Sequence, residues 1–89
     1  MRAIVTVTGK DRVGIIAEVC SLLASLRVNI LDISQTVMQE FFTMSMLVDV
    51  STTDISFDEI REALSAQGAK GGLSIRIQRE DIFEAMHRI

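Results

Sequence analysis

A cysteine and a histidine, two side chains that could form a catalytic pair, occur once each in this chain of 89 residues. A thiol that lies beside an imidazole can act as a nucleophile. Cys20, however, falls among apolar residues at helical spacing, and His87 lies near the C-terminal end. We interpret them as a small buried hydrophobe and a surface imidazole. Cys, His, Asp and Glu nowhere have the spacing of metal ligands. The sequence therefore predicts no catalytic site, no metal, no cofactor and no enzyme.

A glycine-bounded loop, GKDRVG at residues 9–14, is the second place where chemistry could occur. A phosphate loop needs lysine and a hydroxyl residue directly after its second glycine, but two isoleucines follow here. The dinucleotide pattern G-x-G-x-x-G is absent as well. What remains is a helix N-terminus with free N–H groups, flanked by Lys10 and Arg12. Such a place favours a small anionic group such as a carboxylate.

Gly14 and Asn29 each allow two interpretations. Gly14 could leave room for a ligand or a neighbouring backbone, at a cost of about 1 kcal/mol against alanine in a helix. Alternatively, Asp11 caps the helix, Gly9 makes a turn and Gly14 fits tight helix–sheet packing. The amide of Asn29 offers donors and an acceptor, which suits a zwitterion, but Asn29 could equally be a turn residue after a helix. Local physics leaves these alternatives open.

Hydrophobic periodicity predicts the elements that position this loop. Residues 2–8 alternate between apolar and polar, which predicts a strand. Asp11 stands where a helix N-cap is expected, and Asn29 is expected to end that helix. The apolar stripe of the helix comprises Ile15, Ile16, Val19, Cys20, Leu22, Leu23 and Leu26.

Two further alternating segments, residues 29–38 and 41–50, predict a pair of strands with a reversal at 39–40. In the first of these strands, one face is expected to carry Leu31, Ile33 and Val37, and the other Asp32, Ser34 and Thr36. In the second, Phe42, Met44, Met46, Val48 and Val50 are expected on one face.

The second helix has clearer signals. Ser56 and Glu59 have the spacing of a capping box, and Gly68 is expected at the left-handed position that ends the helix. Residues 73–78 alternate and predict a last strand. The remaining segment, 79–89, predicts a short helical tail with Ile82, Phe83 and Met86 on one side.

This order, β-α-β-β-α-β, predicts an α+β fold: a ferredoxin-like sandwich whose four-stranded antiparallel sheet carries two helices on one face. The short C-terminal helix completes a single domain over residues 1–89. The other sheet face is left uncovered, and it is a place for a partner contact or for the tail. Its expected residues mix small polar and apolar types: Ser34, Thr36, Thr43, Ser45 and Leu47.

Composition narrows the classes of partner. A hydrophobic content of 48% is high for 89 residues and indicates that a second subunit covers part of the surface. A net charge of −3 gives no electrostatic footprint for nucleic acid or a membrane. Base stacking on the open sheet face has little support either, because Tyr and Trp are absent and the four Phe are at positions 41, 42, 57 and 83. One cysteine forms no internal disulfide and no segment is long and apolar enough to span a bilayer, so we expect a cytoplasmic protein.

The segments VTGKDRVGIIAEV and LRVNILDISQTV, in this order of elements, resemble the ACT domain, the small-molecule regulatory module of amino-acid metabolism. The chain is similar to small bacterial proteins that consist of one stand-alone ACT domain with a helical tail. This resemblance implies a homodimer built side by side. It also implies an effector, often an amino acid, bound at the interface between the first strand–helix loop and the start of the second strand.

By position, the resemblance assigns the loop side of the ligand site to Lys10, Asp11, Arg12, Val13 and Gly14, and the strand side to Asn29 and Ile30. Many relatives have proline where this chain has Val13. Valine keeps a backbone N–H that proline would remove. A catalytic or DNA-binding domain is not attached, so any regulation would act in trans on a protein partner.

Three hypotheses about function follow. In the first, the protein is a dimeric regulatory sensor of an amino acid. In the alternative, it is a dimeric protein-interaction module that needs no ligand. A hydrolase on the same fold, resembling acylphosphatase and using Arg12 and Asn29, is the third, and it rests on fold alone.

Overall fold

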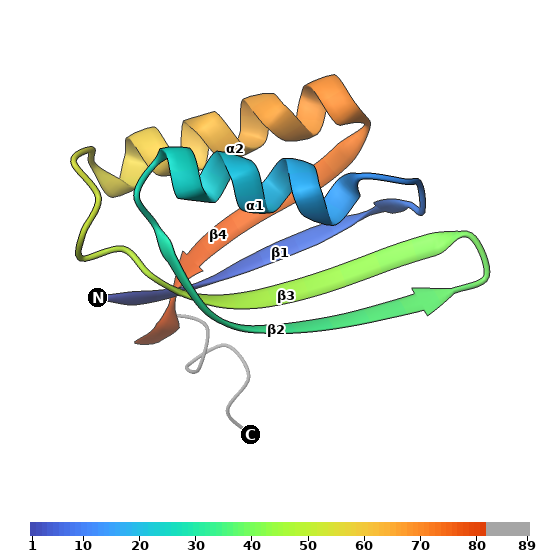
Figure 1. Ribbon diagram of the computed structural model, residues 1–89, viewed down its shortest axis with the longest axis horizontal. Helices are drawn as coiled ribbons and strands as arrows, with labels where there is room; N and C mark the ends of the chain where they lie inside the picture. The colour runs from blue at the N-terminus through green and yellow to red at the C-terminus, as the bar shows by residue number, and fades with distance from the viewer. Residues whose placement is uncertain (82–89) are drawn as a thin grey trace.

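A computed structural model describes residues 1–81 of the chain. Its elements follow the expected order (Figure 1): β1 (Arg2–Lys10), α1 (Ile15–Ser25), β2 (Asn29–Met38), β3 (Phe41–Asp49), α2 (Phe57–Gly71) and β4 (Leu73–Arg79). The ferredoxin-like fold class is confirmed. The predicted tail helix falls largely on residues 82–89, outside the described ones; Arg79 itself ends β4.

The four strands form one antiparallel sheet in the order β2-β3-β1-β4, and both helices cover the same face of it (Figure 1). Strand register fixes what lies at each end. At one end Asp49 of β3 pairs with Asn29 of β2 and with Arg2 of β1. At the other end Phe41 pairs with Met38 and Lys10. The start of β2 and the end of β1 are therefore at opposite ends of the sheet.

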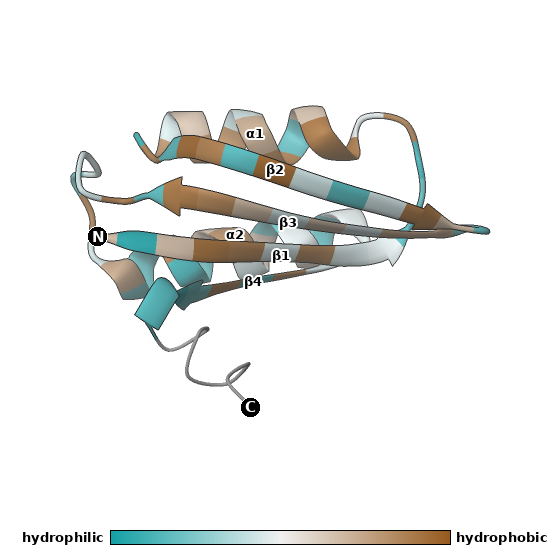
Figure 2. Ribbon diagram, turned by 90° about the horizontal axis from the view of Figure 1, so that it is seen from below, coloured by the Kyte–Doolittle hydropathy of each residue, from teal (hydrophilic) through white to brown (hydrophobic). Residues whose placement is uncertain are grey.

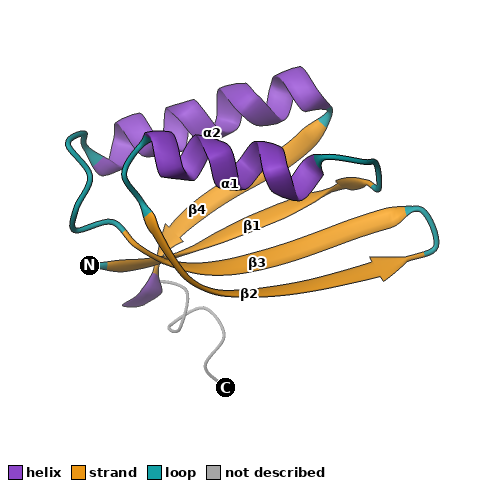
Figure 3. Ribbon diagram, viewed as in Figure 1, coloured by secondary structure: helices purple, strands orange, loops and turns teal. Residues whose placement is uncertain are grey.

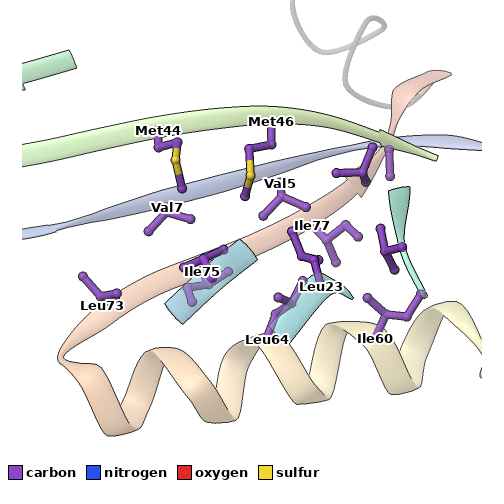
Figure 4. Close-up of a cluster of buried hydrophobic side chains, with 14 of the residues drawn as sticks. Val5, Val7, Leu23, Met44, Met46, Ile60, Leu64, Leu73, Ile75 and Ile77 are labelled. Carbon is purple, nitrogen blue, oxygen red and sulfur yellow. The ribbon is translucent and has the colours of Figure 1, made fainter. Parts of the chain in front are cut away.

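The core lies between the sheet and the two helices (Figure 4). Alternate strand residues point into it, as period-2 patterning requires. Each large apolar side chain buried in this way stabilises the fold by about 1.5–3 kcal/mol. The largest fully buried side chains are Ile15, Leu23, Met44, Met46, Ile60, Leu64, Val5, Val7, Val19 and Val48.

Helix α1 begins and ends differently from the prediction. Its N-cap is Gly14, in the left-handed region at φ 93°, and no side chain caps it. Asp11 as the cap was wrong: its backbone N–H instead donates to the Glu40 carbonyl at 2.7 Å. Asn29 does not end the helix either. The helix stops at Ser25, and Arg27 makes the reversal with a φ of 61°.

Helix α2 begins as predicted and ends later. The Ser56 hydroxyl accepts from the Glu59 N–H at 3.1 Å, and the Glu59 carboxylate accepts from the Ser56 N–H at 3.1 Å. The left-handed C-cap is Gly72, at φ 70°, rather than Gly68. Gly68 is a buried helical residue, and a Cβ there would lie 2.6 Å from the Leu73 carbonyl oxygen. It is glycine because the helix crosses β4 closely.

Strand β2 is an edge strand with a register shift between Ile30 and Asp32. Ile33 and Val37 share the helix-covered face, because their partners in β3 are the buried Met46 and Phe42. Leu31 lies at the shift and has no partner in the register, so the expected common face of Leu31, Ile33 and Val37 is interrupted there. A bulge of this kind is not visible in an alternating sequence.

Candidate ligand site

The loop between β1 and α1 borders an open cavity of about 410 Å³. Three of the predicted site residues line it, and the first turn of α1 and one residue of β3 complete the wall. The lining residues are Asp11, Arg12, Gly14, Ile15, Ile16, Ala17 and Phe42. Sequence reasoning missed Phe42, which comes from a strand 28 positions after Gly14 and reaches the loop only through its pairing with Gly9 in β1.

Gly14 is required by its backbone conformation. A φ of 93° lies in the region that residues with a Cβ adopt only under strain. A Cβ at this position would meet nothing within 4 Å, so the interpretation as tight helix–sheet packing was wrong. Space for a neighbour is present, and the reason for glycine is conformational. Close packing belongs instead to Gly9, where a Cβ would lie 2.7 Å from the Leu73 Cδ2; the interpretation of Gly9 as a turn residue was wrong.

The N-terminus of α1 presents backbone donors to the cavity. The first helical hydrogen bond runs from the Glu18 N–H to the Gly14 carbonyl, at 2.9 Å. The N–H groups that precede Glu18 in this turn have no carbonyl one turn back to donate to. With no capping side chain at Gly14, these donors and the helix dipole favour an anion at this end of the cavity.

Arg12 ties the loop to both helices. Its Nη2 lies 2.7 Å from the Glu18 carboxylate and 3.3 Å from the Gly71 carbonyl at the end of α2. A Cβ at Gly71 would come within 2.6 Å of the same nitrogen. The guanidinium is thus already paired, and its main effect is to hold the loop beside α1 and the α2–β4 turn.

The remaining predicted residues do not line this cavity. Lys10 follows Gly9 on β1 and so belongs to the opposite sheet face by strand alternation. Val13 is 97% exposed. Asn29 and Ile30 begin β2 at the far end of the sheet, on the order of 30 Å from the loop end at about 3.3 Å per strand residue. Figure 3 shows the β1–α1 loop and the α1–β2 connection at opposite ends of α1.

Asp49 is the charged neighbour of Asn29 in the register. Hydrogen bonds lower the pKa of Asp49 below its ordinary value: first the one from the Ser51 hydroxyl, then the one from the Ser51 N–H at 2.9 Å. The N-terminal ammonium, 3.7 Å away, acts in the same direction. The start of β2 therefore lies beside a carboxylate that is ionised at neutral pH.

Residues 1–81 offer little support for metal binding, for a membrane-spanning helix or for hydrolysis. No group of three His, Cys, Asp or Glu in this part of the chain could hold a metal ion. Neither described helix is long and apolar enough to cross a bilayer. Arg12 and Asn29 do not meet within one chain, so a single chain does not assemble the pair that the hydrolase hypothesis uses.

The pattern of elements and the loop at α1 correspond to a known family model, that of the ACT domain, which matches residues 2–78. The chain belongs to the ACT domain family. ACT domains are in general small-molecule-binding regulatory modules, and they commonly bind amino-acid effectors and dimerise. ACT domain proteins of this kind are regulatory in type.

Similar proteins show the same domain both alone and as part of larger chains. A UPF0237 protein from Clostridium acetobutylicum is 57% identical over 89 residues, which is 100% of both chains. The structure of an ACT domain protein from Streptococcus pneumoniae superimposes with a TM-score of 0.83 at 46% identity, over 98% of both chains. The regulatory subunit of aspartate kinase from Thermus thermophilus has a TM-score of 0.68 at 25% identity, over 86% of this chain and 50% of that one.

Proposed function

We propose that this ACT domain is a homodimeric sensor of an amino acid and regulates a partner protein in trans. The observation that carries the proposal is the cavity at the N-terminus of α1, where an uncapped helix start meets an apolar wall. The helix N–H groups suit the carboxylate of the effector. Ile16 and Phe42 suit an apolar side chain. Val13, exposed in the same loop, belongs to the rim of this site, whereas Lys10 lies on the opposite sheet face and is left out of it.

The ammonium of the effector needs polar partners: the Asp11 carboxylate lines the cavity, and Asn29 of a second copy fits as a further one. Antiparallel pairing of two β2 edges brings the start of one strand toward the end of the other. Met38 ends β2 at the same end of the sheet as the β1–α1 loop. Asn29 and Ile30 of one protomer then approach the loop of its partner, which joins the two halves of the predicted site.

The surface around β2 supports such a dimer. An edge strand leaves a row of backbone donors and acceptors unpaired. Ile33 and Val37, 41% and 51% exposed, lie on the helix side of this edge. Ile16 of α1 is also exposed. A second copy that covers these side chains removes their apolar surface from water.

The test is a thermal-shift and calorimetric screen of the common amino acids, followed by Asn29→Ala. We expect at least one apolar amino acid to stabilise the protein, and Asn29→Ala to weaken its binding about 10-fold, as loss of a charge-assisted hydrogen bond predicts. Gln35→Ala, in the middle of the same strand, is the matched control and should bind normally. A response that survives Asn29→Ala unchanged would remove Asn29 from the site.

The alternative is a ligand-independent dimeric interaction module. It is favoured by exposed apolar side chains at the loop end of the sheet, where Phe41 and Met38 pair with each other in the register. Val13 of the β1–α1 loop is exposed as well. This hypothesis predicts a dimer that does not respond to any amino acid in the screen. It also predicts one specific protein captured by the wild-type chain and lost with Phe41→Ser.

A further inference from the structure

The sheet face opposite the helices, called here the open face, is covered by neither α1 nor α2 (Figure 2). Strand alternation assigns to it the residues that lie between the buried ones. They are Ile4, Thr6, Thr8 and Lys10 of β1, Asp32, Ser34, Thr36 and Met38 of β2, Phe41, Thr43, Ser45 and Leu47 of β3, and Ser74, Arg76 and Gln78 of β4. Small hydroxyl side chains therefore fill the middle of the face, and its large apolar side chains lie at the two ends.

The two ends of the open face differ in shape. At the loop end, Phe41 and Met38 pair in the register and are 56% and 71% exposed, so they project from the sheet. At the other end lies a shallow groove of about 180 Å³, which borders on Ile4, Asp32 and Leu47. Phe41 and Leu47 belong to the same strand and are about 20 Å apart at roughly 3.3 Å per residue. A projecting ring and an apolar groove thus lie at opposite ends of β3.

This arrangement is complementary to itself. A two-fold axis that crosses the strands at Met44 brings two open faces together with their β3 strands antiparallel. Phe41 of each copy then lies over Leu47 of the other, and Thr43 of each copy lies over Ser45 of the other. In such an isologous contact one patch supplies both sides of the interface. Each projecting ring therefore meets a groove, and small side chains meet small ones between them.

The charged side chains of the open face lie at its rim. Lys10 is at the loop end, and Asp32 and Arg76 belong to the two edge strands. In the antiparallel pairing they lie over Ile4, Met38 and a serine, respectively, so none of them lies over a like charge. Long lysine and arginine side chains can keep their charged ends in water at such a rim. An apolar contact surrounded by a polar rim is the usual anatomy of a protein interface.

The area of the open face suits a contact between dimers. Four strands at about 4.8 Å and seven residues at about 3.3 Å give a flat face of roughly 400 Å². One pair of faces thus buries about 800 Å², whereas two stacked dimers bring two pairs together and bury about 1,600 Å², the standard size of a stable interface. A β2 ladder over residues 32–38 is centred on Gln35, which pairs with Met44. The edge axis and the face axis therefore meet, and the assembly closes at four chains.

We propose that the open face binds the open face of a second copy, so that two β2-edge dimers stack back to back as a tetramer. Phe41 of each chain enters the groove beside Leu47 and Ile4 of the chain that faces it. The tetramer rests on the dimer of the proposed function, but the face contact needs neither the β2 edge nor an effector.

The first test measures the mass of the full-length chain in solution by sedimentation velocity. Wild type and Phe41→Leu, which keeps an apolar side chain, should be tetramers, and Phe41→Ser should be a dimer. An assembly that is unchanged by Phe41→Ser would overturn the face contact and leave the β2 dimer standing. A wild-type dimer that becomes a monomer with Phe41→Ser would support the face contact and overturn the β2 dimer.

A second measurement locates the contact. Phe41→Cys and Leu47→Cys are combined in a Cys20→Ser background and treated with a short bismaleimide. The two positions are about 20 Å apart within one chain, too far for this reagent, so it can join them only between chains. We expect a cross-linked dimer, and none when Phe41→Cys is combined with Glu62→Cys, because Glu62 is exposed on α2. No cross-link in the first variant would overturn the proposal and assign the groove to another occupant, either the C-terminal segment or a different protein.

Discussion

The two helices of this domain begin in opposite ways. At α2 the polar groups before and at the helix start have hydrogen-bond partners. The Ser51 N–H donates to the Asp49 carboxylate, and Ser56 and Glu59 exchange hydrogen bonds in a complete capping box. At α1 the chain arrives through a left-handed glycine, with no side chain on the helix donors. A capped helix start contributes stability, and its capped N–H groups are not available to a ligand. An uncapped start gives up that stability and keeps its donors for another group.

The largest loss of stability is expected at Gly14, the glycine that precedes the uncapped helix α1. Gly14→Val places a β-branched residue at φ 93°, so we expect the free energy of unfolding to fall by about 2 kcal/mol and the amino-acid response to disappear. Chemical denaturation and the thermal-shift screen measure these two quantities. Gly14→Asn is the matched control: asparagine tolerates this region, so it should keep most of the stability. Equal losses in both variants would contradict the conformational explanation.

Removing the capping box of α2 should lower the stability of the fold and leave effector binding unchanged. Ser56→Ala deletes the acceptor for the Glu59 N–H, and we expect a loss of about 1 kcal/mol in denaturant unfolding. Effector affinity should not change, because Ser56 is far from the cavity lining. The control is Ser74→Ala on an exposed strand position. A change in affinity with Ser56→Ala would mean that the two helix starts are coupled.

The ion pair between Arg12 and Glu18, which holds the β1–α1 loop, should contribute little to stability and more to effector binding. Arg12 and Glu18 are both exposed, so either alanine variant should cost no more than about 0.5–1 kcal/mol. If Arg12 acts by holding the loop, Arg12→Ala and Glu18→Ala weaken effector binding alike, by a few-fold in calorimetry. Tighter binding with Glu18→Ala would show instead that a released Arg12 contacts the carboxylate.

The smallest effect is expected in how the stability depends on pH through Asp49 and Ser51, which lie between β3 and α2. Hydrogen bonds from Ser51 lower the folded-state pKa of Asp49, so this group stabilises the protein above its unfolded pKa, about 3.9, and that stability is lost as pH falls through the lower folded value. Ser51→Ala should therefore be slightly less stable than wild type at pH 7. The difference should vanish at the acid end of a pH series of unfolding curves. In an Asp49→Asn background, Ser51→Ala should lose this pH dependence.

The same contrast explains what the sequence could predict. The capping box of α2 is a local signal, readable from two residues three positions apart, and it was confirmed. Asp11 offered an equally local signal for α1, but its N–H donates to Glu40 of the β2–β3 turn and the helix begins only after Gly14, so Asp11 lies in the loop. The sequence indicated that Gly14 has a special role, but its left-handed φ could not be predicted, because it depends on how the loop packs onto the sheet.

The site was less predictable than the fold, because its parts are joined by topology. Alternation in residues 41–50 gave Phe42 a buried side but could not place it beside the β1–α1 loop, which only the pairing of β1 with β3 does. The separation of Asn29 from that loop follows from the strand order in the same way. The bulge at Ile30–Asp32 has no local signature at all.

That bulge also governs how far assembly can proceed. It interrupts the free edge of the sheet, so an uninterrupted ladder between two β2 strands is confined to residues 32–38. The opposite edge, β4, carries Arg76 and Arg79, whose charges oppose the addition of another strand. In the proposed dimer, pairing through the two β2 strands leaves the β4 edges free, and the arginines of β4 oppose the addition of further chains.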